Sequence, residues 1–104
     1  MAVSSTLHLV AKLDQLREGV GQLVLVEGRE IALFLKGREV HAIDARCPHA
    51  GGPLQEGMVC GDVVVCPLHL RRVDLRSGAV EDWSAPVRAY EAVVEDGKVL
   101  IRFP

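Results

Sequence analysis

Short apolar runs alternate with turn residues along the whole chain. Valine, isoleucine, leucine and phenylalanine dominate the runs, and each run is only a few residues long. This pattern is typical of small all-β domains. The runs that we interpret as strands lie at residues 6–13, 22–27, 30–36, 39–45, 62–66, 73–76, 87–95 and 98–103.

Glycines between the runs mark the expected turns. Asp96-Gly97 separates the last two runs and predicts a hairpin, because a tight hairpin turn needs positive φ at its central residues. Gly28 and the pair Lys36-Gly37 are weaker signals of the same kind. Residues 11–19 also allow one or two turns of helix, with two leucines on one face and a glycine as the stop.

Length and charge narrow the class of protein. The 104 residues show no repeat and no linker, so we interpret residues 1–104 as one all-β domain. The net charge of -2 does not favour binding to nucleic acid or to a membrane surface, and no apolar run is long enough to span a bilayer. The first residues do not resemble a signal peptide, and three cysteines do not form a disulfide framework. A cytoplasmic location is therefore expected.

One segment departs from the strand pattern. Residues 46–57, RCPHAGGPLQEG, are rich in glycine and proline and have no hydrophobic period. Long irregular segments inside a compact domain are usually functional. This segment holds Cys47 and His49, and a second pair, Cys66 and His69, begins where the predicted strand 62–66 ends. Two loops thus each carry one thiol and one imidazole.

Two matched pairs indicate a metal site, because chance neighbours would not repeat the arrangement. Zinc fingers usually group cysteines with cysteines and histidines with histidines, whereas here each loop mixes the two. Mixed loops suit a binuclear centre, in which each loop gives its sulfur to one metal and its nitrogen to the other. A Rieske [2Fe-2S] centre has this ligation, with two cysteines on one iron and two histidines on the other.

The chain resembles the Rieske family in the motifs CPHAGGPL, residues 47–54, and CPLH, residues 66–69. The similarity continues through VDLRSGAVEDWSAP and the expected closing hairpin to the end of the chain. It implies small stacked antiparallel sheets, with two loops that clamp one cluster per chain at a tip and a proline loop near residue 86 that partly covers it. By position, Cys47 and Cys66 bind the inner iron, and His49 and His69 bind the outer iron.

Two further sets of positions indicate which kind of Rieske protein this is. The respiratory type has an extra cysteine in each loop, and these form a disulfide; the matching positions here are Gly52 and Leu68. That type also has two hydroxyl side chains after the second histidine, at positions that are Arg71 and Val73 in this chain. Fewer hydrogen bonds to the cluster sulfurs imply a low-potential, ferredoxin-type protein.

Several residues keep simpler interpretations. Cys60 is expected to be neither a ligand nor part of a disulfide, but a buried thiol in a strand or turn. Arg71 and Arg72 are either solvated arginines on a strand edge or a basic rim that docks an acidic partner. His8 and His41 lie in strand patterns without a partner motif, and we interpret both as surface or edge residues.

The resemblance implies a one-electron carrier that catalyses no reaction alone. Its donor would be a flavin-dependent NAD(P)H reductase, its acceptor a terminal oxygenase or a related reductase, and the free protein would be a monomer. The alternative is a small Rieske-type subunit of a larger enzyme, as in nitrite reductase systems, and the proteins that copurify with it would discriminate. A structural zinc module is a third interpretation, and it would be colourless.

Overall fold

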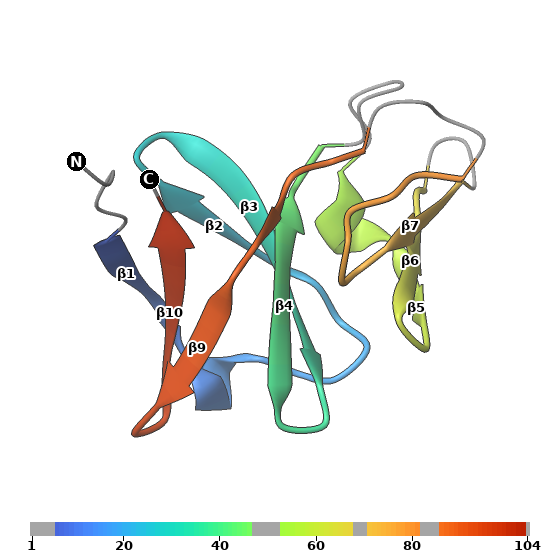
Figure 1. Ribbon diagram of the computed structural model, residues 1–104. Coiled ribbons are helices and arrows are strands. Elements are labelled where there is room, and N and C mark those ends of the chain that lie inside the picture. The colour runs from blue at the N-terminus through green and yellow to red at the C-terminus, as the bar shows by residue number, and fades with distance from the viewer. Residues whose placement is uncertain (1–5, 47–52, 68–70, 82–85, 104) are drawn as a thin grey trace.

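The apolar runs of the sequence form strands of three antiparallel sheets (Figure 1). The computed structural model describes residues 6–46, 53–67, 71–81 and 86–103. The first sheet has the order β1 (Thr6–Lys12), β10 (Lys98–Phe103), β9 (Ala92–Glu95). The second has the order β2 (Gln22–Val26), β3 (Arg29–Lys36), β4 (Glu39–Asp44), β8 (Ala89–Tyr90). The third has the order β5 (Met58–Cys60), β6 (Val63–Val65), β7 (Arg72–Asp74). The predicted all-β class with stacked sheets is confirmed.

The second sheet is the middle layer, and its strand β3 is buried on both faces. Successive side chains of a strand point to opposite faces, and β3 is fully buried from Ile31 through Phe34. Ile31 and Leu33 pack in a cluster with Val99 of β10, whereas Ala32 and Phe34 pack in a second cluster with β6 and β7 residues. Continuous rather than alternating hydrophobicity in residues 31–34 is the sequence sign of this two-sided burial.

Tight turns connect the long strands, as the glycines predict. Asp96 and Gly97 both have positive φ, 51° and 72°, between Glu95 and Lys98, which pair directly. Positive φ at both central residues is the geometry of a two-residue type I′ turn. Glu27 and Gly28 repeat it between β2 and β3, and Gly37 has a φ of 63° between β3 and β4.

Residues 11–19 contain one helical turn, which is the lower limit of what the sequence allows. Strand β1 continues to Lys12, which pairs with Lys98, and only a single 3-10 turn, η1 (Leu13–Gln15), follows. The amide of Leu13 donates a hydrogen bond to the carbonyl of Gly97 at 2.8 Å. The start of this segment therefore pairs with the β9–β10 hairpin, and the amide of Leu16 donates to the carbonyl of Leu13 at 3.1 Å within the turn. Leu16 is still buried in the core, as its apolar character indicates.

Two strand boundaries differ from the sequence pattern. The run at residues 87–95 is not one strand: β8 pairs with β4 in the middle sheet, and β9 pairs with β10 in the first sheet. The chain changes sheets at Glu91, which lies between them. Strand β5 was not predicted, because its three residues give no readable period; pairing with β6 defines it. A second 3-10 turn, η2 (Leu54–Glu56), precedes β5.

Candidate iron–sulfur site

Cys66 follows the last residue of β6, and its side chain is fully buried. Its backbone amide donates a hydrogen bond to the carbonyl of Arg71 at 2.8 Å. This bond closes a short loop, and His69 belongs to that loop by sequence. The second predicted ligand pair therefore has its thiol held at the end of a strand, shielded from water.

The base of the other predicted ligand loop is closed in the same way. Arg46 and Pro53 form an isolated antiparallel bridge, and the amide of Leu54 donates to the carbonyl of Ala45 at 2.7 Å. Residues 47–52 connect the two sides of this base. Cys47 and His49 lie in that segment, outside the described residues, and so does His69 in the other loop.

One hydrophobic cluster holds the bases of both loops. Ala45 and Leu54 from the first base pack with Cys66 and Val73 from the second, and each is at most 2% exposed. Two segments far apart in the sequence thus begin from one packed core. Val73, at a position where the respiratory type has a hydroxyl, is fully buried and apolar.

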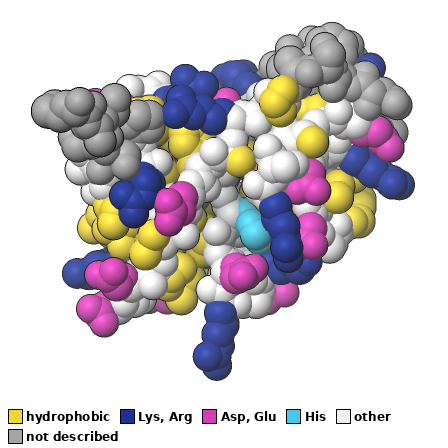
Figure 2. Space-filling view, in the orientation of Figure 1, with side chains coloured by type: hydrophobic (Ala, Val, Ile, Leu, Met, Phe, Trp, Pro, Cys, Tyr) yellow, Lys and Arg dark blue, Asp and Glu magenta, His cyan; other side chains and the backbone are white. Residues whose placement is uncertain are grey.

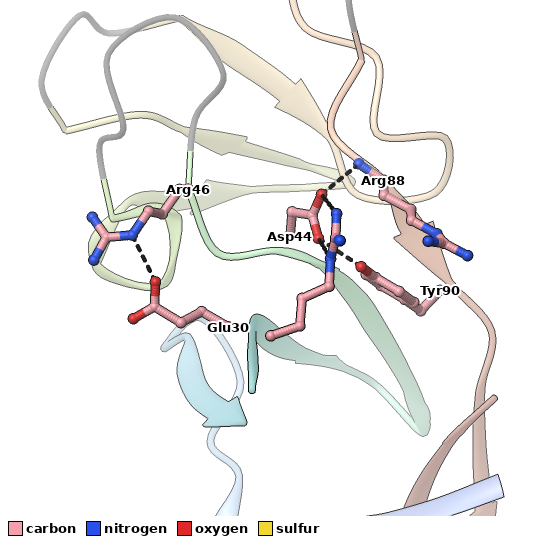
Figure 3. A network of polar contacts seen from close by, with 6 residues as sticks. Glu30, Asp44, Arg46, Arg88 and Tyr90 are labelled. Carbon is pink, nitrogen blue, oxygen red and sulfur yellow. Dashed lines mark hydrogen bonds and ion pairs between the residues drawn. The ribbon is translucent and has the colours of Figure 1, made fainter. Parts of the chain in front are cut away.

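Asp44, at the end of β4, gathers polar side chains just before the first ligand loop (Figure 3). Arg29 donates to both of its carboxylate oxygens, from Nε at 3.1 Å and from Nη2 at 3.2 Å. The hydroxyl of Tyr90 donates at 2.7 Å and the backbone amide of Arg88 at 3.2 Å. This network attaches the end of β4 to β3 and β8, and with it the point where the loop departs.

Burial and hydrogen bonding shift the pKa of Asp44 in opposite directions. Partial burial raises its pKa, but the hydrogen bonds from Arg29, Tyr90 and the Arg88 amide together outweigh burial and hold the pKa below its usual value. Burial, and then the hydrogen bond to the Asp44 carboxylate, raise the pKa of Tyr90 to about 12. The network therefore consists of an ionised carboxylate and a protonated phenol at neutral pH.

A second pair of contacts secures the same strand end. Arg46 Nε donates to Glu30 Oε1 at 2.6 Å, and the amide of Ala45 donates to the carbonyl of Glu30 at 3.1 Å (Figure 3). Asp44, Glu30 and Arg29 were not among the residues predicted for the site. The available signal was an aspartate at the end of a predicted strand, just before the loop that carries Cys47.

The described donor set fits an iron–sulfur cluster as far as it extends. Thiolate sulfur is the ligand type for such clusters, and the Cys66 thiol lies buried at the base of one loop. Among residues 6–46, 53–67, 71–81 and 86–103, no three His, Cys, Asp or Glu side chains come together as a metal site. A centre with three or more such ligands that includes Cys66 would therefore take at least one of them from outside these ranges.

The match to known proteins decides the family. Residues 6–99 match the family described as Rieske [2Fe-2S] domain. This chain belongs to the Rieske family. Members bind a Rieske [2Fe-2S] cluster, so the predicted cofactor is confirmed.

Similar Rieske proteins include components of oxygenase systems. The ferredoxin component of the naphthalene 1,2-dioxygenase/salicylate 5-hydroxylase systems of Ralstonia sp is 31% identical, over 88% of this chain and 90% of that protein. The ferredoxin of carbazole 1,9a-dioxygenase from Nocardioides aromaticivorans is 36% identical, with a TM-score of 0.86 over 96% of this chain and 98% of its own.

Another similar structure belongs to a different system. The small subunit of nitrite reductase [NAD(P)H] from Erwinia carotovora is 32% identical, with a TM-score of 0.80 over 94% of this chain and 82% of its own. The chain is therefore similar both to ferredoxins of oxygenase systems and to a reductase subunit. Within the described residues no helix has the length and apolarity to cross a membrane.

Two sequence interpretations of this Rieske chain need correction. Cys60 is exposed at the end of β5, not buried, because the β5–β6 turn carries it to the surface. Arg71 is half-buried and donates from Nη1 to the carbonyl of Glu81 at 3.1 Å, so it is not a solvated arginine, whereas Arg72 is exposed on β7. His41 lies at a local edge of β4, beyond the two residues that pair with β8, and its side chain is 13% exposed. His8, on the edge strand β1, is as expected.

Proposed function

We propose that this Rieske protein is a one-electron carrier that takes electrons from a flavin-dependent NAD(P)H reductase and delivers them to a terminal oxygenase. The observation that carries the proposal is the extent of the match: the chain covers 90% of a dioxygenase ferredoxin component and 98% of another, so carrier and chain correspond nearly end to end. We treat residues 1–104 as one functional unit, monomeric when free, without a reaction of its own.

In this proposal Cys47 and Cys66 bind one iron, and His49 and His69 bind the other. The fully buried Cys66 and the shared hydrophobic base of the two loops support it, because thiolate ligands in a dry, fixed site protect the cluster from water. When bound, the cluster stores and releases one electron. The chain supplies two loop bases fixed by backbone hydrogen bonds, and a strand end held by the Asp44 network.

The surroundings of the second loop support a low reduction potential. Neither Arg71 nor Val73 offers a hydroxyl, and Val73 is fully buried and apolar. With fewer hydrogen-bond donors to its sulfurs, the reduced and more negative cluster is stabilised less. We expect a midpoint near the lower end of the range of roughly -150 to +300 mV for Rieske centres. A redox titration followed by visible and EPR spectra measures it, and a midpoint in the upper half of that range would contradict this assignment.

Electron transfer itself is the direct test of the carrier role. The purified protein should be reduced by a flavin reductase with NAD(P)H, and should then reduce an oxygenase in a single-turnover experiment, returning to its oxidised spectrum. A protein that is reduced but transfers no electron to any oxygenase tested, and that elutes from native extracts only within a larger enzyme, supports the second candidate. That candidate is a fixed small subunit of a reductase, and it is favoured by the similarity to the nitrite reductase subunit.

A further inference from the structure

A cleft lies at the end of β4 that is opposite to the ligand loops. It has a volume of about 530 Å³. Its lining residues come from the β3–β4 hairpin, from β9 and from the segment after β7: Arg38, Glu39, Val40, His41, Arg76, Ala92 and Val94. Glu39 and Asp44 are the first and last of the six residues of β4, so the Glu39 end of the cleft lies roughly 17 Å along the strand from the base of the first loop.

The change of sheets at Glu91 creates this cleft. On the edge of β4 that faces away from β3, β8 pairs only with Ala42 and Ile43. The chain then leaves the middle sheet, and β9 pairs with β10 instead. The start of β4 is consequently left without a neighbouring strand on that side, and β9 forms the opposite wall.

Positive charge predominates around the cleft. Arg38 and Arg76 are both exposed, and Glu39 is the carboxylate among the lining residues. Arg76 Nη2 forms an ion pair with Asp62 Oδ2 at 3.6 Å, and Asp62 also pairs with Lys36. Figure 2 shows a histidine on this face with basic and acidic side chains beside it. An anion between Arg38 and Arg76 would thus meet two guanidinium groups, and it would compete with Asp62 for that of Arg76.

His41 adds an unused hydrogen-bonding atom. Its Nε2 is buried and has no hydrogen-bond partner among the described residues. The nearest carboxylate oxygen, Glu39 Oε1, is 3.9 Å away, too far for a hydrogen bond. A buried polar atom without a partner is costly and rare. A ligand or an ordered water that reaches this position would complete it.

The remaining lining residues are apolar. Val40 is 8% exposed and belongs, with Ala92 and Val94, to the hydrophobic cluster between the first and middle sheets. The cleft therefore combines an apolar wall with two arginines and an imidazole. A cavity of this size is within the usual range for small-molecule sites, roughly 300–1,000 Å³.

We propose that this cleft binds a small organic carboxylate. Its carboxylate lies between Arg38 and Arg76, which present planar donors suited to carboxylates. Its apolar body lies against Val40, Ala92 and Val94. The site is remote from the ligand loops, so binding is independent of electron transfer at the cluster and of the proposed carrier role.

Titration of the isotope-labelled holoprotein with benzoate, benzamide and inorganic phosphate tests the proposal. Benzoate should shift the amide signals of Arg38, His41, Arg76 and Val94 saturably. Benzamide has the same shape without the charge. It should bind weaker than benzoate by a factor of about ten or more, since a hydrogen bond between charged groups is lost. Phosphate has the charge without the apolar body and should also bind more weakly.

Variants of the exposed arginines sharpen the test without endangering the fold. Arg38→Gln and Arg76→Gln should each weaken benzoate binding roughly tenfold. Arg17→Gln, at an exposed arginine outside the cleft, should leave it unchanged. Equal affinity for benzamide, equal affinity for phosphate, or no saturable shifts with any probe would each overturn the proposal. In the last case water is the partner of His41.

Discussion

The two sides of the middle sheet differ in how their strands are stabilised. We call the first and middle sheets together the body, and β5–β6–β7 the small sheet. In the body, β1 has seven residues and β3 has eight, and two-residue turns connect neighbouring strands. In the small sheet each strand has three residues. Such short strands are not stable alone, so the small sheet depends on packing against β3 and β4 and on the ligand loop after Cys66.

The body and the small sheet therefore have different roles. The body is a self-sufficient scaffold, because its core lies between two sheets of long strands. The small sheet carries Cys66 and shares its core with the bases of both ligand loops. Ligand bonds between the loops would cross-link that side, and binding free energy at such a site is also folding free energy. Local stability is therefore expected to be lowest where the cluster binds.

The largest effect is expected from removal of a ligand. Cys66→Ala should abolish the cluster, because no other described thiol lies near that position and Cys60 is exposed at the far end of the small sheet. Iron and acid-labile sulfide analysis with EPR measures the loss. His69→Ala should do the same. Either variant with an unchanged Rieske EPR signal would overturn the assigned ligand set.

The matched control for this prediction is the other described cysteine. Cys60→Ala should keep the full cluster spectrum and change the free energy of unfolding by less than about 0.5 kcal/mol, since the side chain is exposed. Loss of iron in this variant would mean that the exposed thiol takes part in the site.

Removal of the cluster from the wild-type chain should separate the two sides. After chelation, amide hydrogen exchange should become fast at Val64 and Val73 in the small sheet, because the loops no longer hold it. Protection should persist at Leu33 and Ile101 in the body. Exchange measured by NMR on the apo and holo proteins decides this. Equal loss of protection on both sides would show that the chain unfolds as one unit.

Two buried leucines probe the same contrast with identical chemistry. Leu33 packs in the body core and Leu75 in the core under the small sheet, and they are 0% and 1% exposed. Leu33→Ala should lower the free energy of unfolding of both apo and holo protein by about 2–5 kcal/mol. Leu75→Ala should instead accelerate iron loss, with little effect on the apo body. Denaturant unfolding and iron-release kinetics distinguish the two, and identical profiles would contradict these different roles.

The smallest effect concerns Asp44 at the junction of the two sides. Its folded pKa is depressed, so its contribution is present above the unfolded pKa of about 3.9 and is lost as pH falls through the folded value. Asp44→Asn should cost about 1–2 kcal/mol at neutral pH, and the difference from wild type should shrink in acid. Asp14→Asn, at an exposed carboxylate, is the control. An equal cost at pH 3 and pH 7 would show that charge is not responsible.

Some features of the site could be read from side-chain chemistry alone. Paired Cys/His loops are a local pattern, and so the family and the cofactor followed from residues 47–54 and 66–69. The Asp44 network could not be found this way, because Arg29 and Tyr90 are distant in sequence from Asp44 and meet it only through the pairing of β3, β4 and β8. The cleft at His41 could not be found this way either. The sequence pattern predicts that His41 lies on a strand, but it does not show which strands lie beside that strand.

The all-β class, the tight turns at Gly28, Gly37 and Asp96-Gly97, and the candidate ligands follow from local sequence. Each of these depends on local conformational preference or on donor chemistry within a few residues. Only tertiary contacts explain why residues 87–95 divide between two sheets, why Ala11 and Lys12 pair with β10 before a single 3-10 turn, and why Cys60 is exposed while Cys66 is buried. In each case the backbone hydrogen bonds or the buried surface come from a partner strand far away in the chain, and local propensity cannot identify that partner.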